Sequence, residues 1–362
     1  MPSSRSKTSL FITPTQQDHA YRISIDAGWF PQLSSFLPLS TYSKVVILSD
    51  ENVARHWYTP HPSLHQYPLI QIPAGESFKN GDTLEYIQTQ MLRFNMDRRS
   101  LLINLGGGVV GDIGGFAAST YMRGMDFVQI PTTLLAQVDA SIGGKVGINW
   151  KGYKNMLGVF VQPKAVLIDV HTLSTLPPRE LRAGMAEVIK HGLVWDEAYF
   201  QDIGLNPSYE SNWIDIIRRS CEIKASVVEK DTLETGLRKI LNFGHTLGHA
   251  IESLSQDWDK PLLHGEAVAL GMLGEAHISV SMNRLSEEQF QTIERALRNT
   301  QLPIRIPHTL IWSNVEEKIA SDKKKSGNTI YWTLLRGIGA AEFNVRVPSR
   351  FVKEAFQYLQ QP

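Results

Sequence analysis

The chain has 362 residues, and its 36 Lys and Arg are balanced by 36 Asp and Glu, so the formal net charge at neutral pH is zero. A neutral chain has no overall field that draws it to nucleic acid or to an anionic membrane, and any anion site must therefore be local. Hydrophobic residues make up 42% and charged residues 20%, which excludes intrinsic disorder and indicates a globular protein. The length suggests about two domains.

The cysteine content and the N-terminal pattern favour a cytoplasmic protein. Cys221 is the single cysteine, which excludes a disulfide within the chain and a cysteine-rich metal site. No apolar run approaches the roughly 18 residues of a membrane span. The basic start, residues 1–7, lacks the apolar stretch of a secretory signal because Leu10–Ile12 is followed at once by Thr13 and Pro14. We therefore expect a soluble leader, a cytoplasmic location and no membrane or nucleic-acid partner.

The first half of the chain alternates short apolar runs with helical stretches. The runs are rich in Val and Ile and are bounded by Gly, Pro, Asp or Asn, which predicts buried strands. These strands are expected at 21–25, 44–49, 69–72, 101–105, 127–130 and 165–168. Helical periodicity lies between them, as at 83–94. This alternation favours a mostly parallel sheet in a Rossmann-like α/β domain spanning 1–177.

After Leu176–Pro178 the pattern becomes helical. A period of 3.6 residues predicts helices at 181–193, 213–228, 240–254, 266–282 and 287–297. Residues 329–335 and 341–347 flank Arg336-Gly-Ile-Gly339 and predict a small hairpin, with a last helix at 350–359. Apart from that hairpin, we expect an all-α domain over 178–362.

A glycine-rich turn, Gly106–Gly111, follows one predicted strand and precedes a helix. In this Gly-x-Gly-x-x-Gly context, backbone N–H groups at a helix N-terminus bind a pyrophosphate, although the motif alone leaves a ligand-free turn as an alternative. Two residues are candidates for a ribose hydroxyl: Asp50 at a strand end, and Asp126 by its spacing from the turn. A second glycine pair, Gly143–Gly144 before Lys145, is either another backbone cradle or a plain loop.

Two histidines, His245 and His249, are spaced i, i+4 and share one helix face. His264 follows after a short connection, and Glu187 belongs to an earlier helix. Imidazole and carboxylate ligands suit zinc or a similar divalent ion, and three protein ligands leave a position open for substrate. Spacing alone favours His245 with His249, although any single histidine is more often a hydrogen-bonded core residue. His191, four residues after Glu187, is interpreted as a neighbour on the helix face.

Taken together, these motifs resemble those of the 3-dehydroquinate synthases, a family within the sugar phosphate cyclases. The resemblance extends from about residue 50 to residue 339. The matching stretches, which keep the order and spacing of the family, are Gly106-Gly-Gly-Val-Val-Gly-Asp112, Thr120-Tyr-Met-Arg-Gly124, Ile130–Asp139, Gly143-Gly-Lys145, Lys154-Asn-Met156, Leu176-Pro-Pro-Arg-Glu180, Ala186-Glu-Val-Ile-Lys190, Leu241–His249, Leu263-His-Gly-Glu-Ala267 and Asp322-Lys-Lys324.

The resemblance implies an NAD-binding α/β domain, a helical domain that carries the metal, and an active site in the cleft between them. It implies a zinc or cobalt ion held by Glu187, His245 and His264, with His249 nearby as a proton-handling residue. The NAD contacts that it implies are Asp50, Glu76, Lys79, Gly108, Val109, Val110, Gly111, Asp112, Thr132, Thr133, Lys145, Lys154, Thr172, Leu173, Ser174 and Thr175.

The implied reaction converts 3-deoxy-D-arabino-heptulosonate 7-phosphate to 3-dehydroquinate and phosphate. It runs through transient oxidation by NAD, elimination of phosphate, re-reduction and intramolecular aldol closure. A substrate with a carboxylate and a phosphate requires local cations, and the candidates are Lys145, Lys190, Lys224, Arg238 and one of Lys323 or Lys324. The resemblance also implies a homodimer in which Arg123 reaches the phosphate across the interface. The polar positions that it implies for orienting hydroxyls or relaying protons are Asp139, Asn155, Glu234, Asn242 and His249.

Three other functions are compatible with parts of the pattern. One is another sugar phosphate cyclase, of the inosose or valiolone type, which acts on a substrate without a carboxylate. Such relatives tend to have other residues in place of Arg238, Asn242 and His249, all three of which this chain keeps. The second is a metal-dependent glycerol or alcohol dehydrogenase, whose neutral substrate leaves the cations unexplained. The third is a non-catalytic regulatory protein on the same fold. Small departures from the family pattern, at Ala140, Val146, Val161 and His191, remove no cation or ligand.

Overall fold

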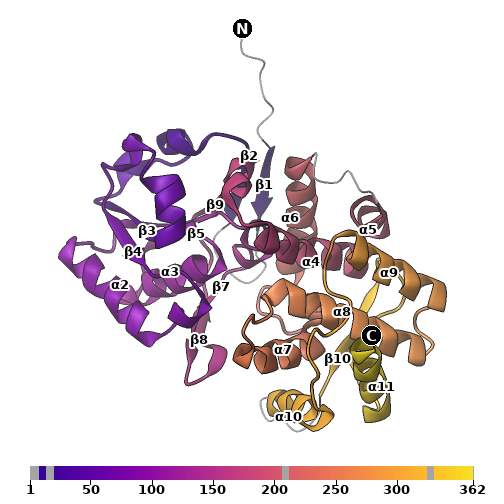
Figure 1. The fold of residues 1–362 in the computed structure, drawn as a ribbon. Helices are drawn as coiled ribbons and strands as arrows, with labels where there is room; N and C mark the ends of the chain where they lie inside the picture. The colour runs from indigo at the N-terminus through magenta and orange to yellow at the C-terminus, as the bar shows by residue number, and fades with distance from the viewer. Residues whose placement is uncertain (1–7, 14–19, 206–211, 324–329, 362) are drawn as a thin grey trace. The chain divides into compact units, whose positions relative to one another are not determined.

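The structure is a computed structural model that describes residues 8–13, 20–205, 212–323 and 330–361. The chain divides into two compact units (Figure 1). The first consists of Met1–Pro177 with Lys224–Thr232, and the second of Pro178–Ile223 with Leu233–Pro362. The helix α6 (Trp213–Lys230) therefore begins in the second unit and ends in the first.

A seven-stranded sheet forms the centre of the first unit, in the order β1-β2-β9-β6-β5-β3-β4. Its strands are β1 (Thr8–Ile12), β2 (Tyr21–Asp26), β3 (Val45–Asp50), β4 (Leu69–Ile72), β5 (Leu101–Gly106), β6 (Asp126–Pro131) and β9 (Ala165–Asp169). All neighbouring pairs are parallel except β1 with β2. The six predicted strands are confirmed, each within one residue of its predicted ends. The leader predicted at 1–7 lies outside the described residues, and β1 directly follows it.

The order of the strands creates a switch point beside β3. From β3 the chain moves outward to β4 and then returns to the other side of β3 as β5. Ligands of open α/β sheets bind outside the carboxyl ends of the strands at such a point. Asp50 ends β3 and Gly106 ends β5, so the ribose candidate Asp50 and the start of the glycine-rich turn both lie at this edge.

Two apolar cores cover the two faces of the sheet, because alternate residues of each strand point to opposite sides. One core contains Val46 and Leu48 of β3 with residues of α2 (Gly81–Arg93) and α3 (Gly108–Thr120). The other contains Val45 and Ile47 with residues of the short turns around them. The remaining elements of this unit are α1 (Glu51–Val53), the 3₁₀-helices η1 (Phe30–Ser35), η2 (Leu39–Thr41), η4 (Pro62–Leu64), η5 (Glu76–Phe78), η6 (Tyr121–Arg123) and η8 (Val170–Thr175), the π-helices η3 (Ala54–Tyr58) and η7 (Ala136–Ala140), and the hairpin β7 (Lys145–Trp150) with β8 (Tyr153–Phe160).

The second unit is helical, as predicted, and carries one hairpin. Besides α6 it contains α4 (Pro178–Trp195), α5 (Glu197–Gly204), η10 (Leu237–Asn242), α7 (His245–Leu254), η11 (Ser255–Asp257), α8 (His264–Ser281), α9 (Glu287–Asn299), α10 (Trp312–Lys323), β10 (Trp332–Leu335), β11 (Ala341–Val345) and α11 (Ser349–Gln360). The continuous helix predicted at 240–254 is wrong. Gly244 has a left-handed φ of 83°, which separates η10 from α7. Thr329, at the start of the predicted hairpin, lies outside the described residues.

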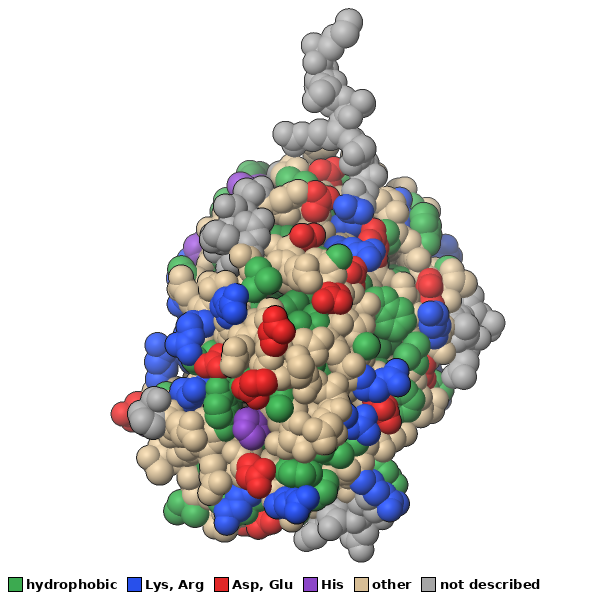
Figure 2. Space-filling view, turned by 90° about the vertical axis from the view of Figure 1, so that its right-hand side faces the viewer, with side chains coloured by type: hydrophobic (Ala, Val, Ile, Leu, Met, Phe, Trp, Pro, Cys, Tyr) green, Lys and Arg blue, Asp and Glu red, His purple; other side chains and the backbone are tan. Residues whose placement is uncertain are grey.

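The face shown in Figure 2 carries basic and acidic side chains interspersed, with hydrophobic side chains in small groups. Such mixing differs from the stripe of a single sign with which proteins bind nucleic acid. Within the described residues, every helix is too short or too polar to span a membrane.

Candidate active site

The glycine-rich turn joins β5 to the N-terminus of α3. Gly107 is the N-cap, and no side chain in the described residues caps this helix, so its first N–H groups remain available to an anion. Close packing requires glycine here. A Cβ on Gly106 would meet Val110 at 2.6 Å, and one on Gly107 would meet Thr133 at 3.0 Å. By contrast, the nearest atom to a Cβ on Gly108 would be Ala140 Cβ, at an ordinary contact distance of 3.5 Å.

The next glycines bring α3 close to the sheet. The carbonyl of Gly111 accepts a hydrogen bond from Gln129 Nε2 at 3.1 Å, and a Cβ on Gly111 would meet Gln129 at 3.2 Å. A Cβ on Gly114 would come within 2.1 Å of Asn104 Oδ1. These positions therefore serve helix–strand packing, while the open side of the turn is at Gly108. Val109 lies between, in the first turn of α3.

The two ribose candidates lie at opposite ends of their strands. Asp50 ends β3 and caps α1, with Oδ1 accepting from the backbone N–H of Asn52 and Val53 at 2.9 and 3.0 Å. Burial raises the pKa of Asp50, and these hydrogen bonds oppose the rise. Asp126 begins β6 and is paired with Leu101, the first residue of β5, so it lies at the amino edge of the sheet. Of the two aspartates, only Asp50 lies at the edge of the sheet where β5 ends at Gly106.

Threonines line the same edge. Thr132 donates its backbone N–H to Gly106 O at 3.0 Å, yet within the described residues its buried Oγ1 has no hydrogen-bond partner. Such a hydroxyl suits a bound polar ligand, since a buried polar group is rarely left unpaired. Thr133 Oγ1 accepts a hydrogen bond of 3.2 Å from the backbone N–H of Ala136, the first residue of η7.

The turn η8 contains Thr172, Leu173, Ser174 and Thr175 and follows the carboxyl end of β9. Thr172 Oγ1 accepts from Gln137 Nε2 at 2.9 Å, and Thr175 Oγ1 accepts from Trp57 Nε1 at 2.7 Å. Gln137 is fully buried and also donates to carbonyl groups of Pro131 and Asp169. The sequence analysis did not single out Gln137, because an isolated Gln carries no local signal of such long-range bonds.

Three of the implied NAD contacts form an ion cluster. The ammonium of Lys79 lies 3.1 Å from Glu76 Oε1 and 3.1 Å from Asp112 Oδ2. Burial lowers the pKa of Lys79, but the two carboxylates outweigh it and raise the pKa overall. Burial also raises the pKa of Asp112, which Lys79 partly offsets. The cluster joins the turn after β4 to the first half of α3.

The hairpin β7–β8 carries three further candidates, and η6 carries a fourth. Lys145 begins β7 after Gly143 and Gly144, both of which have left-handed φ angles, of 93° and 68°. Lys154 and Asn155 lie in β8, where every residue is exposed, and Asn155 has a φ of 51°. Arg123 is also exposed, with a φ of 68° at the end of η6. The Gly143–Gly144 turn is held by a hydrogen bond of 3.1 Å from Gly143 N–H to Tyr21 Oη.

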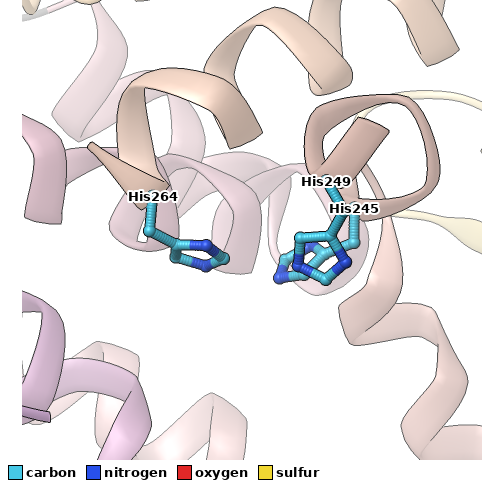
Figure 3. A group of neighbouring side chains, drawn as sticks. All are labelled: His245, His249 and His264. Atoms are coloured by element: carbon cyan, nitrogen blue, oxygen red, sulfur yellow. The ribbon is translucent and has the colours of Figure 1, made fainter. Parts of the chain in front are cut away.

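In the second unit, one carboxylate and two imidazoles converge. Glu187 Oε1 lies 3.7 Å from Nε2 of His245 and 3.8 Å from Nε2 of His264. In a tetrahedral site with metal–ligand bonds of about 2.1 Å, ligand atoms are about 3.4 Å apart, so this spacing fits a divalent ion. The ligand atoms of His245, His249 and His264 also lie within 4.8 Å of one another. Figure 3 shows these three imidazoles gathered together, His264 from α8 and the other two from α7.

In His245 and His264, the second ring nitrogen, Nδ1, also has an acceptor nearby. His245 Nδ1 lies 3.3 Å from Phe243 O, and His264 Nδ1 lies 3.5 Å from Glu252 Oε2. An acceptor at Nδ1 favours the tautomer that presents Nε2 to a metal. Burial, together with the charge of Lys190 and the neighbouring His249 and His264, holds the pKa of His245 well below its usual value. A neutral imidazole is the form that binds a metal.

Two of the remaining cations, Lys190 and Lys224, form ion pairs within their own units. Lys190 forms an ion pair with Glu187, one turn earlier in α4. Lys224 donates to the backbone and side-chain oxygens of Asp139, each at 2.6 Å. In and before η10, Arg238 is buried, and Asn242 Nδ2 donates to Glu234 Oε1 at 2.8 Å. Lys323 ends α10, and Lys324 lies outside the described residues.

Family models match both halves of the chain. The model described as 3-dehydroquinate synthase N-terminal matches residues 69–183, and the one described as 3-dehydroquinate synthase C-terminal matches residues 184–325. The chain is 42% identical to the 3-dehydroquinate synthase of Vibrio atlanticus, over 96% of this chain and 99% of the relative. It is 44% identical to that of Pelobacter propionicus, over 91% and 94%.

Solved structures agree with this fold. A 2-deoxy-scyllo-inosose synthase in complex with carbaglucose-6-phosphate, NAD+ and Co2+ matches with a TM-score of 0.86 and 26% identity, over 96% of this chain and 99% of that one. The 2-epi-5-epi-valiolone synthase of Streptomyces hygroscopicus, with NAD+ and Zn2+ bound, matches with a TM-score of 0.83 and 27% identity, over 96% and 98%. The near full-length identity to the curated relatives, together with both family models, shows that this chain belongs to the 3-dehydroquinate synthase family.

Proposed function

We propose that this chain is an NAD- and metal-dependent lyase that converts 3-deoxy-D-arabino-heptulosonate 7-phosphate to 3-dehydroquinate and phosphate. The observation that carries the proposal is the identity of 40 to 44% to 3-dehydroquinate synthases over most of the chain. The inosose and valiolone synthases among the structural relatives reach only 26 and 27%. A butanol dehydrogenase from Thermotoga maritima, at 13% identity and a TM-score of 0.67, shares the fold alone.

The first unit is proposed to bind NAD along the carboxyl edge of its sheet. The uncapped N-terminus of α3 supplies N–H groups for the pyrophosphate, and the open side of Gly108 admits it. Asp50 uses Oδ1 to cap α1, and we assign its Oδ2 to a ribose hydroxyl. Thr132 Oγ1 gains in the ligand the partner that it otherwise lacks among the described residues.

The second unit is proposed to hold the divalent ion through Glu187, His245 and His264. Structural relatives contain Co2+ or Zn2+ together with NAD+, and the donor set of one carboxylate and two imidazoles suits either ion. When bound, NAD supplies a reversible hydride acceptor, and the ion supplies a Lewis acid that lowers the pKa of an alcohol. The buried carboxylate of Glu187 is held by Lys190, which prevents it from turning away.

The chain's other residues are assigned to the substrate. Lys145, Lys190, Lys224 and Arg238, with Lys323 or Lys324, are proposed to bind its carboxylate and phosphate through charge-assisted hydrogen bonds. Asn242 holds the carboxylate of Glu234 at 2.8 Å, so this pair is suited to orient a hydroxyl or to move a proton. Asp139, Asn155 and His249 are assigned to the same tasks.

We also propose a cytoplasmic homodimer. Strand β8 supports the dimer: Tyr153, Met156, Leu157, Val159 and Phe160 have 38 to 53% of their surface exposed. An exposed apolar strand is typical of a surface that a partner covers, and we propose a second copy there, with Arg123 reaching the phosphate site of its partner. The single cysteine fits a reducing compartment. Light scattering should give a mass of two chains for the wild type and of one chain for Leu157→Asp.

Phosphate release from three substrates tests the proposed reaction. The metal- and NAD-loaded protein is given heptulosonate phosphate, sedoheptulose 7-phosphate or glucose 6-phosphate, while absorbance at the NADH band is followed. We expect release of phosphate from the first substrate alone, without accumulation of NADH, because the cofactor is regenerated in each turnover. Turnover of only the second or third substrate would show a different cyclase, and steady accumulation of NADH would show a dehydrogenase.

A further inference from the structure

Asn149 lies where two sets of candidate residues meet, and neither the motifs nor the comparisons assign it a role. It belongs to β7, at a break in the pairing with β8. The register shifts between Ile148, which pairs with Leu157, and Trp150, which pairs with Tyr153. Bulges of this kind re-aim a side chain and are common next to active sites. Here the bulge turns the half-buried amide of Asn149 toward the extra residues of β8.

Each polar group of Asn149 has a separate partner. Its Oδ1 accepts a hydrogen bond from the backbone N–H of Asn155 at 2.9 Å, and Asn155 has a left-handed φ of 51°. Its Nδ2 donates to the carboxylate of Glu76 at 2.8 Å. Its backbone N–H donates to Lys79 O at 2.8 Å. One residue therefore binds both ends of the turn Glu76–Lys79 and also the left-handed position of β8.

The residues at the two sides of Asn149 have different tasks in the proposed function. Glu76 and Lys79 are assigned to NAD, and Lys79 continues the network to Asp112 on α3. Asn155 is assigned to the substrate. Asparagine adopts a left-handed conformation more readily than other residues with a side chain, and the hydrogen bond to Asn149 Oδ1 fixes Asn155 in it. The amide of Asn149 offers both the acceptor and the donor that the two sides require at once.

We propose that Asn149 is a positioning residue that couples the NAD-binding turn to the substrate-binding strand. Through this residue, the carboxylate of Glu76 and the backbone of Asn155 are fixed relative to each other, so that binding of NAD also orders Asn155. The inference rests on the proposed function for the ligands at the two sides, while the coupling itself is measured without turnover.

The test measures NAD affinity and amide exchange in the full-length protein. NAD is titrated by calorimetry, and hydrogen exchange of the peptide containing Asn155 is followed with and without NAD. In the wild type, we expect protection at Asn155 that increases when NAD binds. In Asn149→Ala, we expect exchange at Asn155 to be about tenfold faster, NAD to bind about three- to tenfold more weakly, and the effect of NAD on Asn155 to be lost.

A charge-reversal series separates the specific contact from general destabilisation. Asn149→Asp places a second carboxylate against Glu76, so NAD affinity should fall below that of Asn149→Ala. In the double variant, the amide introduced at position 76 can donate to the carboxylate introduced at position 149, so Asn149→Asp should cost less NAD affinity in the Glu76→Gln background than in the wild type. As a matched control, Asn299→Ala removes another side-chain amide, which donates to Gly204 O at 3.2 Å in the second unit, and should leave both readouts unchanged.

Retention of wild-type exchange at Asn155 in Asn149→Ala would overturn the inference, as would a NAD-induced protection there that survives the substitution. An equal cost of Asn149→Asp in NAD affinity with and without Glu76→Gln would also overturn it. These results are independent of which sugar phosphate is turned over. A wild-type protein that couples NAD to Asn155 but releases no phosphate from heptulosonate phosphate would contradict the proposed function and leave the coupling intact.

Discussion

The carboxylate of Glu275 accepts a hydrogen bond from the backbone N–H of Gly244, with 2.6 Å between Oε2 and the nitrogen. Its Oε1 accepts from Leu247 N–H at 3.2 Å, so Glu275 on α8 satisfies the first turn of α7. The two helices are in close contact, because a Cβ on Gly271 would come within 1.8 Å of Gly244 O. Helix α7 begins with His245 and α8 with His264, so this contact sets the positions of both imidazoles.

The titration of Glu275 should make the free energy of unfolding depend on pH. Burial raises the pKa of Glu275 from 4.5 to about 8, although the backbone hydrogen bonds oppose the shift. Between those values, the folded protein keeps a proton that the unfolded chain releases, so this contribution is present at low pH and lost as the pH rises through 8. From pH 6 to pH 8, the metal-free wild type should therefore lose about 2 kcal/mol of unfolding free energy relative to Glu275→Gln.

Urea unfolding of both proteins across this pH range provides the measurement. Ser286→Ala is the matched control, because Ser286 caps the first turn of α9, which carries none of the proposed ligands. Its stability should be lower than that of the wild type by about 1 kcal/mol at every pH. Curves for the wild type and Glu275→Gln that run parallel from pH 6 to pH 8 would contradict the assigned titration.

Removal of a ligand should separate the two possible metal sites. Because Glu187 lies against Nε2 of His245 and His264, we expect Glu187→Gln and His264→Ala to weaken Co2+ binding by more than about a hundredfold, while His249→Ala changes it only a few-fold. Competition with a chelator measures the affinity, and the visible spectrum of Co2+ reports the ligand set. If His249→Ala lost the ion and Glu187→Gln kept it, the ion would be bound by the three histidines.

Glu252 should affect the metal through His264. Its Oε2 lies 3.5 Å from His264 Nδ1, behind the nitrogen that faces Glu187. Partners of this kind typically contribute 10- to 100-fold to metal affinity, so we expect a loss of about tenfold in Glu252→Gln. The control is Glu294→Gln, since Glu294 lies on α9, which carries none of the proposed ligands, and pairs with Arg298 and Tyr358. An unchanged affinity in Glu252→Gln would remove Glu252 from the metal site.

Two glycines of α3 should respond differently to alanine. At Gly108 a Cβ meets only ordinary contacts, so Gly108→Ala should leave the melting temperature unchanged or slightly higher, yet weaken NAD binding because a methyl group stands on the open side of the turn. At Gly114 a Cβ would meet Asn104 at 2.1 Å, so Gly114→Ala should destabilise the fold by about 1 to 3 kcal/mol. Calorimetry gives both quantities. Tight NAD binding by Gly108→Ala would contradict the proposed pyrophosphate site.

The sequence predicted those parts of the fold that depend on local patterns. Strands β3 and β5 are buried on both faces, and continuous apolar runs with sharp polar boundaries made them recognisable. The hairpin β7–β8 was missed because β8 is exposed throughout and shows no alternation of apolar and polar residues. The helix predicted at 240–254 failed at Gly244. Glycine is tolerated within a helical pattern, and the left-handed φ there depends on packing against α8.

The candidate site divides in the same way. Spacing placed His245 and His249 on one helix, but the approach of Glu187 and His264 depends on how α4, α7 and α8 pack, which only the family resemblance implied. Asp50 and Asp126 were equivalent by sequence, and the direction of their strands separates them. Asn149, Gln137 and Glu275 act through contacts with residues far along the chain, for which a single sequence contains no local signal.

Recovery of phosphate release after removal of the metal is the most direct test of the central claim, that a divalent ion at Glu187, His245 and His264 serves a phosphate-eliminating enzyme with bound NAD. The protein is stripped with a chelator, the loss of the ion is verified, and phosphate release from heptulosonate phosphate is measured before and after Zn2+ or Co2+ is added back. We predict loss of activity, full recovery with either ion, and no recovery in Glu187→Gln. Undiminished phosphate release by the stripped protein would contradict the account.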